Sequence, residues 1–215
     1  MAIPRRIIYS CQSAYLRSPA DIACRNRVKE LHPGWDIQCV LSSEAPRHFG
    51  YAWPEMDNVW SSLAKVDHRC TLAGLVALYK GGGFYFDTGI WLDLPLDELV
   101  DSNLVLASSG ELSDGDFLQV YGQPPGFSQQ RYLISTDVVA CENGHWFVEK
   151  MLAAFIQSAQ EYEVLRSPPE VGLAPNFATI CNVMYGGRFG SREIVLPPPV
   201  DPLLGGFGHY GCRVS

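Results

Sequence analysis

The first 87 residues alternate short apolar runs with helical segments, and this alternation limits the possible folds more than any other feature of the chain. Arg6–Cys11 (RIIYSC) predicts a buried strand. Residues 18–21 (SPAD) predict a helix start, with serine as N-cap and proline at the first helical position. Residues 32–34 (HPG) end that helix, and residues 35–41 (WDIQCVL) predict a second strand. Strand, helix and strand in this order predict an α/β domain with a mostly parallel sheet.

A second predicted helix is followed by three glycines and a third strand. This helix spans residues 59–80, and its second half is apolar on all sides, so we expect it to be deeply buried. Residues 109–130 are rich in Gly, Ser, Asp, Gln and Pro, which predicts a long surface excursion. The tail from residue 197 onward is dense in Pro and Gly, and we expect it to wrap over the rest. The remaining predicted elements are strands at 84–87, 103–108 and 131–141 and helices at 144–160 and 176–184.

Composition limits the class of protein. The 215 residues are 47% hydrophobic and 18% charged, which suits one globular domain with a sizeable core. The formal net charge of −7 argues against a general nucleic-acid binder. No run of about 18 uncharged apolar residues occurs, so we expect no membrane span. The seven cysteines form no CxxC pair, which predicts small buried thiols in a reducing, cytoplasmic compartment.

The stretch YKGGGFYFDTG at residues 79–89 combines bare backbone with an aspartate at a strand end. Gly81 suits a helix C-cap, and Asp87 suits the start of a turn, but Gly82 and Gly83 need another reason. In open α/β sheets, ligands bind at the carboxyl ends of strands. A carboxylate there can hold a divalent cation or a sugar hydroxyl. We therefore expect a ligand at Asp87, with small neighbours that let a bulky phosphate approach.

Three stretches resemble a known family: residues 3–10 (IPRRIIYS), 78–88 (LYKGGGFYFDT) and 134–152 (ISTDVVACENGHWFVEKML). They resemble the DXD-containing sugar transferases of GT-A fold. The nearest groups are yeast initiating mannosyltransferases, bacterial capsular sugar transferases and the catalytic domains of large glucosylating toxins. The resemblance covers most of the chain and is specific at residues 78–88. It implies one domain over residues 1–215, in which 1–108 bind the nucleotide sugar and 109–215 form the acceptor side and a closing tail.

The activity that the resemblance implies belongs to polysaccharide biosynthesis. A hexosyl or deoxyhexosyl group moves from a nucleotide-diphosphate sugar, with UDP favoured over GDP, to a glycan or other sugar acceptor. Retention of configuration and use of Mn²⁺ or Mg²⁺ are implied by the family alone, and an acceptor on a membrane would bring the enzyme to its surface. The implied donor-binding residues are Ser10, Cys11, Asp67, Arg69, Gly82, Gly83, Asp87, Thr88 and Gly89.

The chain departs from the family pattern at the second aspartate of the DXD motif, where it has Gly89. One direct metal ligand is therefore missing, and Asp93, four residues on, is a weak substitute. Three interpretations stay open. Asp87 binds the metal together with His209 from the tail, or the enzyme works with little or no metal, or the domain binds its ligand without turnover.

Two further places carry candidate residues. On the helix before the glycines, Asp67 shares a stripe with Thr71 and Gly74, whereas Arg69 is about 200° away and cannot lie on the same face. Asp67 therefore suits a sugar or ribose contact, and Arg69 suits a phosphate contact only if the helix starts late. Asp137 ends a predicted strand segment, where a carboxylate can orient an acceptor hydroxyl or stabilise a developing oxocarbenium ion. An ordinary turn at Asp137 is an equal alternative.

Two rival functions remain. A non-catalytic module that binds nucleotide sugars or glycans is motivated by Gly89. A Rossmann-type dinucleotide enzyme is disfavoured, because its glycines would follow the first strand and open a helix, whereas these follow a helix and open the third strand.

Overall fold

The computed structural model describes residues 2–12, 18–44, 55–63, 66–88, 90–111, 132–165, 181, 185, 188–196, 206–207 and 212–214. Within these residues, no helix is both long and apolar enough to cross a lipid bilayer. The elements are, in chain order, β1 (Arg6–Cys11), α1 (Pro19–Leu31), β2 (Asp36–Leu41), a 3₁₀ turn (Ser42–Glu44), α3 (Glu55–Ser62), α4 (Val66–Gly81), β3 (Gly83–Phe86), β4 (Ile90–Trp91), a second 3₁₀ turn (Asp97–Leu99), β5 (Leu104–Glu111), β6 (Tyr132–Cys141), α6 (Trp146–Leu165), β7 (Glu193–Leu196), β8 (Gly206–Phe207) and β9 (Cys212–Val214).

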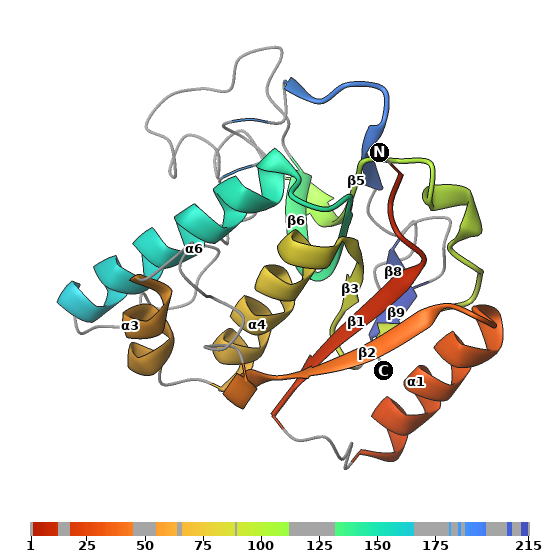
Figure 1. Cartoon of the computed structure of the whole chain (residues 1–215), viewed down its shortest axis with the longest axis horizontal. Helices are drawn as coiled ribbons and strands as arrows, with labels where there is room; N and C mark the ends of the chain where they lie inside the picture. The colour runs from red at the N-terminus through yellow and green to blue at the C-terminus, as the bar shows by residue number, and fades with distance from the viewer. Residues whose placement is uncertain are drawn as a thin grey trace.

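A six-stranded sheet of order β2-β1-β3-β6-β5-β7 forms the middle layer, with α4 and α6 on one side and α1 on the other (Figure 1). Strand β1 pairs in parallel with β2 and β3, and β5 pairs in parallel with β7. Strand β6 runs antiparallel to both of its neighbours, β3 and β5. The mixed, mostly parallel sheet flanked by helices confirms the predicted α/β class.

Each face of the sheet has its own apolar core, because side chains alternate between the two faces along every strand. Ile8 and Tyr85 belong to the core that α4 and α6 cover. Ile7 and Phe86 belong to the core on the other face, together with Val28 from α1. Strands β1 and β3 are buried on both sides, which explains why their sequences are nearly continuous apolar runs.

Most predicted elements are confirmed within a few residues, and the helix before β3 is the main difference. Instead of one helix over residues 59–80, the chain forms α3 and α4. Arg69 Nε donates a hydrogen bond of 2.7 Å to the backbone oxygen of Leu63, just after α3. This side chain satisfies a carbonyl group that a continuous helix would have paired internally. The short strands β4 and β7 were not predicted, and residues 112–131, most of the predicted surface excursion, lie outside the described residues.

The three glycines between α4 and β3 have a packing explanation. Gly82 and Gly83 have φ angles of 65° and 115°, which residues with side chains rarely adopt. A Cβ atom on Gly82 would lie 2.9 Å from the Asn143 backbone nitrogen, and one on Gly83 would lie 2.6 Å from the Arg6 carbonyl oxygen. The glycines therefore let β3 start in close contact with its neighbours. The residue with positive φ is Gly82 rather than the expected Gly81, which is the last residue of α4.

The C-terminal tail returns to the segment that follows β3. Strand β9 pairs antiparallel with β4, with Val214 opposite Ile90 and Arg213 opposite Trp91. Strand β8 completes this small sheet by pairing with β9 (Figure 1). The described part of the tail thus packs beside the chain just after Asp87, in agreement with the expectation that the tail wraps over the domain.

Candidate functional site

Three polar residues line up at the carboxyl ends of neighbouring strands. The parallel register of β1 and β3 pairs Tyr9 with Phe86, which puts Ser10 beside Asp87 one residue further on. The antiparallel register of β3 and β6 puts Asp137 opposite Asp87, and the Asp87 N–H donates to the Asp137 carbonyl oxygen at 2.9 Å. Residues opposite each other on paired strands point to the same face. Ser10, Asp87 and Asp137 therefore form one polar row at the end of the sheet.

Asp87 lies at the start of a turn and is exposed. Its Oδ1 accepts a hydrogen bond of 2.7 Å from the Thr88 N–H, and its carbonyl oxygen accepts one of 3.2 Å from the Ile90 N–H. Gly89 lies outside the described residues. The predicted turn at Asp87 is thus confirmed. The Asp87 side chain is exposed at the carboxyl end of β3, and ligands of α/β sheets bind at such strand ends.

Asp137 is half-buried and is held by a neighbour on its own strand. The buried Ser135 hydroxyl donates a hydrogen bond of 3.1 Å to Asp137 Oδ2, and the Asp137 N–H donates to the same hydroxyl oxygen at 3.2 Å. These bonds fix the direction of the carboxylate. We call Asp87 and Asp137 the carboxylate pair.

A buried tyrosine lies below the carboxylate pair, and sequence analysis missed it. The Tyr85 hydroxyl forms a hydrogen bond of 3.1 Å with Ser10 Oγ, and both side chains are buried. Burial, followed by the nearby charge of Asp87, raises the pKa of the Tyr85 hydroxyl far above its usual value, so the group is neutral. The signal in the sequence was the spacing of two between Tyr85 and Asp87, which puts both on one face of the strand.

Helix α4 brings its amino-terminal half to the same end of the sheet. Gly74 packs directly on the Tyr85 ring, and Cys70 contributes to the electrostatic environment of the Tyr85 hydroxyl. Gly74 therefore faces this end of β3. The Asp67 side chain lies outside the described part of the chain. Arg69 is instead directed to α3, where its guanidinium carbon lies 4.7 Å from the centre of the Trp60 ring.

Cys11, at the end of β1, corrects the expectation that all cysteines are thiols. Its Sγ is joined to that of Cys39 on β2 as a disulfide, with the Cα atoms 6.9 Å apart. The Cys11 side chain is therefore engaged within the sheet. Among the described residues, Cys24, Cys70, Cys141 and Cys181 form no disulfide. Cys24, Cys141 and Cys181 are buried, as expected.

Two predicted donor-binding residues lie at the other end of β3. Gly82 and Gly83 contact the start of β1 and the end of β6, a full strand length from Asp87. Their packing accounts for their lack of side chains and does not favour a phosphate contact. His145 lies beyond the same end, where its Nε2 is 3.6 Å from the Glu193 carboxylate and its Nδ1 accepts a hydrogen bond from the Phe147 N–H. This agrees with a structural role for His145.

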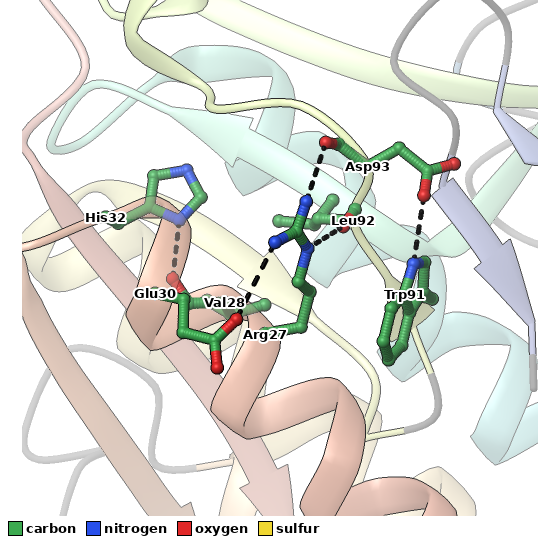
Figure 2. Close-up of polar contacts among 7 residues, drawn as sticks. All are labelled: Arg27, Val28, Glu30, His32, Trp91, Leu92 and Asp93. Atoms are coloured by element: carbon green, nitrogen blue, oxygen red, sulfur yellow. Dashed lines mark hydrogen bonds and ion pairs between the residues drawn. The ribbon is translucent and has the colours of Figure 1, made fainter.

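Asp93, the weak substitute for the missing aspartate, lies at the junction with α1. Figure 2 shows its Oδ1 accepting a hydrogen bond of 3.0 Å from Trp91 Nε1, and its carbonyl oxygen accepting one of 3.3 Å from Arg27. His32, in the HPG stretch that ends α1, is buried at the same junction. Its Nδ1–H donates to the Val28 carbonyl oxygen at 2.8 Å. These contacts are architectural.

The carboxylate pair has the donor chemistry that a hard divalent cation needs. Mg²⁺ and Mn²⁺ prefer carboxylate oxygens and keep several waters or phosphate oxygens as further ligands. Among the described residues, no group of three or more His, Cys, Asp or Glu side chains converges on one point. His209, the other predicted metal ligand, lies outside the described residues. Two carboxylates on neighbouring strands therefore fit a cation that shares its coordination with a bound diphosphate.

Comparison with known proteins places this geometry in a fold family. No protein-family model and no curated protein matches the sequence. The structure of the PaToxG glycosyltransferase matches 86% of this chain and 70% of its own, with a TM-score of 0.56 and 12% sequence identity. The galactosyltransferase LgtC, in complex with donor and acceptor sugar analogues, matches 88% of this chain and 72% of its own, with a TM-score of 0.46 and 16% identity. The chain is thus structurally similar to glycosyltransferases of GT-A fold over most of its length.

Proposed function

We propose that the protein is a glycosyltransferase that moves a sugar from a nucleotide-diphosphate sugar, UDP rather than GDP, to a glycan acceptor. The fold supports this class of reaction. The observation that carries the proposal is the carboxylate pair, in which Asp87 and Asp137 lie opposite each other on neighbouring strands, at the carboxyl end of β3. That end of an α/β sheet is where a diphosphate ligand binds.

The chemistry of transfer explains why two carboxylates suit this place. The nucleotide diphosphate leaves with negative charge, and a bound Mn²⁺ or Mg²⁺ supplies Lewis-acid stabilisation of that charge. Asp87, which is exposed, is the carboxylate that holds the cation, and Asp137 contributes a second carboxylate from β6. Asp137 therefore takes the place of the aspartate that the chain lacks at Gly89. His209 remains a candidate ligand from the tail.

Asp137 also has a role toward the sugar. Its carboxylate is half-buried and fixed by Ser135, so it keeps its orientation without a ligand. A fixed negative charge beside the transferred sugar stabilises an oxocarbenium-like transition state or orients the acceptor hydroxyl. Asp87 then holds the cation and the diphosphate, and Asp137 shares the cation and also faces the transferred sugar.

The remaining expectations stay part of the proposal. Residues 1–108 bind the donor, and residues 109–215 form the acceptor side with a closing tail. Ser10, Cys11 and Thr88 lie at the donor end of the sheet, where their backbone groups contact the nucleotide. The proposed acceptor belongs to a polysaccharide pathway.

A thermal-shift panel of UDP, GDP and their sugar conjugates, with and without Mn²⁺, tests this function. A ligand at one hundred times its Kd stabilises the folded state by about 2.7 kcal/mol, which corresponds to about 5 to 10 °C for a chain of this size. We expect that shift for one nucleotide family, in the presence of Mn²⁺. No shift with any nucleotide under either condition would contradict the proposal.

The alternative is a binding module without turnover, and the absence of an aspartate at Gly89 favours it. The sugar conjugate that gives the largest shift separates the two. Slow hydrolysis of that donor, abolished by Asp137→Asn while binding persists, identifies an enzyme. Binding with no hydrolysis or transfer by the wild-type protein, under any divalent metal, identifies the module.

A further inference from the structure

Two buried hydroxyl groups from neighbouring strands meet directly below the proposed site. Ser10 Oγ on β1 and the Tyr85 hydroxyl on β3 are 3.1 Å apart, and the exposed fractions of the two residues are 2% and 1%. We call them the hydroxyl pair. Burial of a hydroxyl without a partner is costly, so this bond ties Ser10, in the polar row, to Tyr85 on β3, two residues before Asp87.

The Tyr85 ring has little freedom to move away from this position. Gly74 on α4 lies flat against it, and a Cβ atom on Gly74 would overlap the ring, at 2.7 Å from Cδ2. A glycine inside a helix costs about 1 kcal/mol relative to alanine, so a structural reason for it is expected. The reason here is that the ring occupies the space of the missing side chain.

The hydroxyl pair points toward the carboxylate pair. Tyr85 precedes Asp87 by two residues on β3, so both side chains lie on the face that carries Ser10 and Asp137. The charges of Asp87 and Asp137 both act on the Tyr85 hydroxyl. The two hydroxyls hold two protons but share one hydrogen bond, so either arrangement leaves one O–H to donate elsewhere.

We propose that the hydroxyl pair of Ser10 and Tyr85 positions the carboxylate pair for binding the donor diphosphate. It locks the ends of β1 and β3 side by side, and its second O–H donates toward the carboxylates above it. Tyr85 touches neither donor nor metal in this scheme, so it is a positioning residue. The inference rests on the proposed function, because it concerns how that same site is held.

The other face of the sheet provides a matched control. Tyr9 lies on β1, next to Ser10, and is 3% exposed, so it is buried as fully as Tyr85. Its hydroxyl is buried without a hydrogen-bond partner among the described residues, and its ring packs against Phe86 on the face away from the carboxylate pair. Removal of this hydroxyl leaves the ring packing intact and disturbs no hydrogen bond within the described part of the chain.

The experiment measures the affinity for UDP in the presence of Mn²⁺ by calorimetry, together with the melting temperature. We expect Tyr85→Phe and Ser10→Ala each to weaken binding about tenfold, the change that one lost hydrogen bond of about 1.4 kcal/mol produces. The double variant should be no weaker than either single variant, because both remove the same bond. Ser10→Thr, which keeps the hydroxyl, should restore most of the affinity, and Tyr9→Phe should bind as the wild type does.

The outcomes separate this inference from the proposed function. A wild-type protein that binds neither UDP nor GDP with Mn²⁺ overturns both. A wild-type protein that binds, and loses binding in Asp87→Asn but not in Tyr85→Phe, overturns the inference alone. A lower melting temperature with unchanged affinity in Tyr85→Phe also overturns it, because the bond then serves stability only. If Tyr85→Phe does not fold, the affinities of Ser10→Ala and Ser10→Thr decide by the same criterion.

Discussion

The two ends of β3 have different roles, although the strand is only four residues long. At the amino end, Gly82 and Gly83 are packed against the backbone of neighbouring strands and adopt conformations that few residues tolerate. At the carboxyl end, Asp87 is exposed and lies opposite a second aspartate, Asp137, on the neighbouring strand. The stretch at residues 79–89 therefore combines glycines that serve packing with an aspartate that suits ligand binding. Closeness in sequence to Asp87 is therefore not enough to identify these glycines as a phosphate-binding loop.

The comparison predicts that substitutions at the two ends have opposite consequences. Changes at the amino end should lower the free energy of unfolding and leave ligand affinity intact in the folded molecules. Changes at the carboxyl end should lower ligand affinity or turnover and leave stability nearly unchanged. A single substitution that lowers both the free energy of unfolding and the ligand affinity would argue against this difference between the two ends of β3.

The largest effect is expected from Gly83→Ala. The added Cβ would lie 2.6 Å from the Arg6 carbonyl oxygen at a φ of 115°, so the variant carries both a backbone clash and conformational strain. We expect the free energy of unfolding to fall by about 3 kcal/mol or more, measured by urea denaturation. Gly144→Ala is the matched control. Its φ is 68° with no atom within 4 Å of the added Cβ, so only strain of about 1 kcal/mol is expected.

Equal losses in the two glycine variants would mean that the close contact with Arg6 does not matter. A Gly83→Ala protein of normal stability would contradict the claim that the amino end of β3 needs glycine for its packing.

The next effect is expected from Asp137→Asn at the carboxyl end. The amide keeps the shape and can still bond to Ser135, but the negative charge is lost. We expect the rate of donor hydrolysis or transfer to fall about a hundredfold, within the range for loss of a charge-stabilising group in an active site. The melting temperature should change little. Asp97→Asn, at an exposed ion pair with Arg5, is the control and should leave the rate unchanged. A rate within twofold of wild type in Asp137→Asn would remove Asp137 from the chemistry.

Stability should fall as the pH is lowered below about 6.5, because two buried histidines are neutral in the folded protein. Burial lowers the pKa of both His32 and His145 below the ordinary value of 6.5. The unfolded chain therefore binds protons from about pH 6.5 downward that the folded chain does not bind, which favours unfolding. Each unit of difference in pKa contributes about 1.4 kcal/mol. Above about pH 6.5 these two groups contribute no pH dependence.

Melting temperatures between pH 7.5 and 5.5 check this prediction. His32→Gln should flatten the profile, whereas His68→Gln, at an exposed position on α4, should not. A melting temperature that rises as the pH falls would show that these histidines are protonated in the folded state.

The smallest effect is expected at the junction of α1 and the segment after β4. Arg27 donates hydrogen bonds of 3.4 and 3.3 Å to the carbonyl oxygens of Leu92 and Asp93, and it pairs with Glu30 at 3.6 Å (Figure 2). These contacts are long and partly exposed, so Arg27→Gln should cost less than about 1 kcal/mol of unfolding free energy. Lys29→Gln on the same helix is the control, with no expected change. A loss of several kcal/mol would show that this junction, rather than the glycine packing, anchors the domain.

Much of the fold could be predicted from the sequence, because the apolar runs of β1, β2 and β6 and the start and stop signals of α1 are local. The break between α3 and α4 could not, because it depends on a contact from Arg69 back to the Leu63 carbonyl. Strand β4 is two residues long and exists through its pairing with β9, more than 100 residues later. Such long-range pairings leave no local pattern in the sequence.

The candidate site was predicted in part, through single residues rather than through their grouping. Asp87 and Asp137 were separate candidates, and the antiparallel register of β3 and β6 joins them. Tyr85 was missed because an aromatic residue in a buried strand is indistinguishable from core by pattern alone. The donor role of Gly82 and Gly83 stays a prediction, and their packing at the amino end of β3 gives another reason for their lack of side chains.

Calorimetric titration of UDP with Mn²⁺ into wild-type protein and Asp87→Asn tests the central claim most directly. The claim is that the exposed carboxylate at the end of β3 binds the metal–diphosphate part of the donor. It predicts that the variant melts at the wild-type temperature but binds at least about thirtyfold more weakly, the loss of about 2 kcal/mol expected for one charged ligand. Wild-type affinity in Asp87→Asn would contradict it.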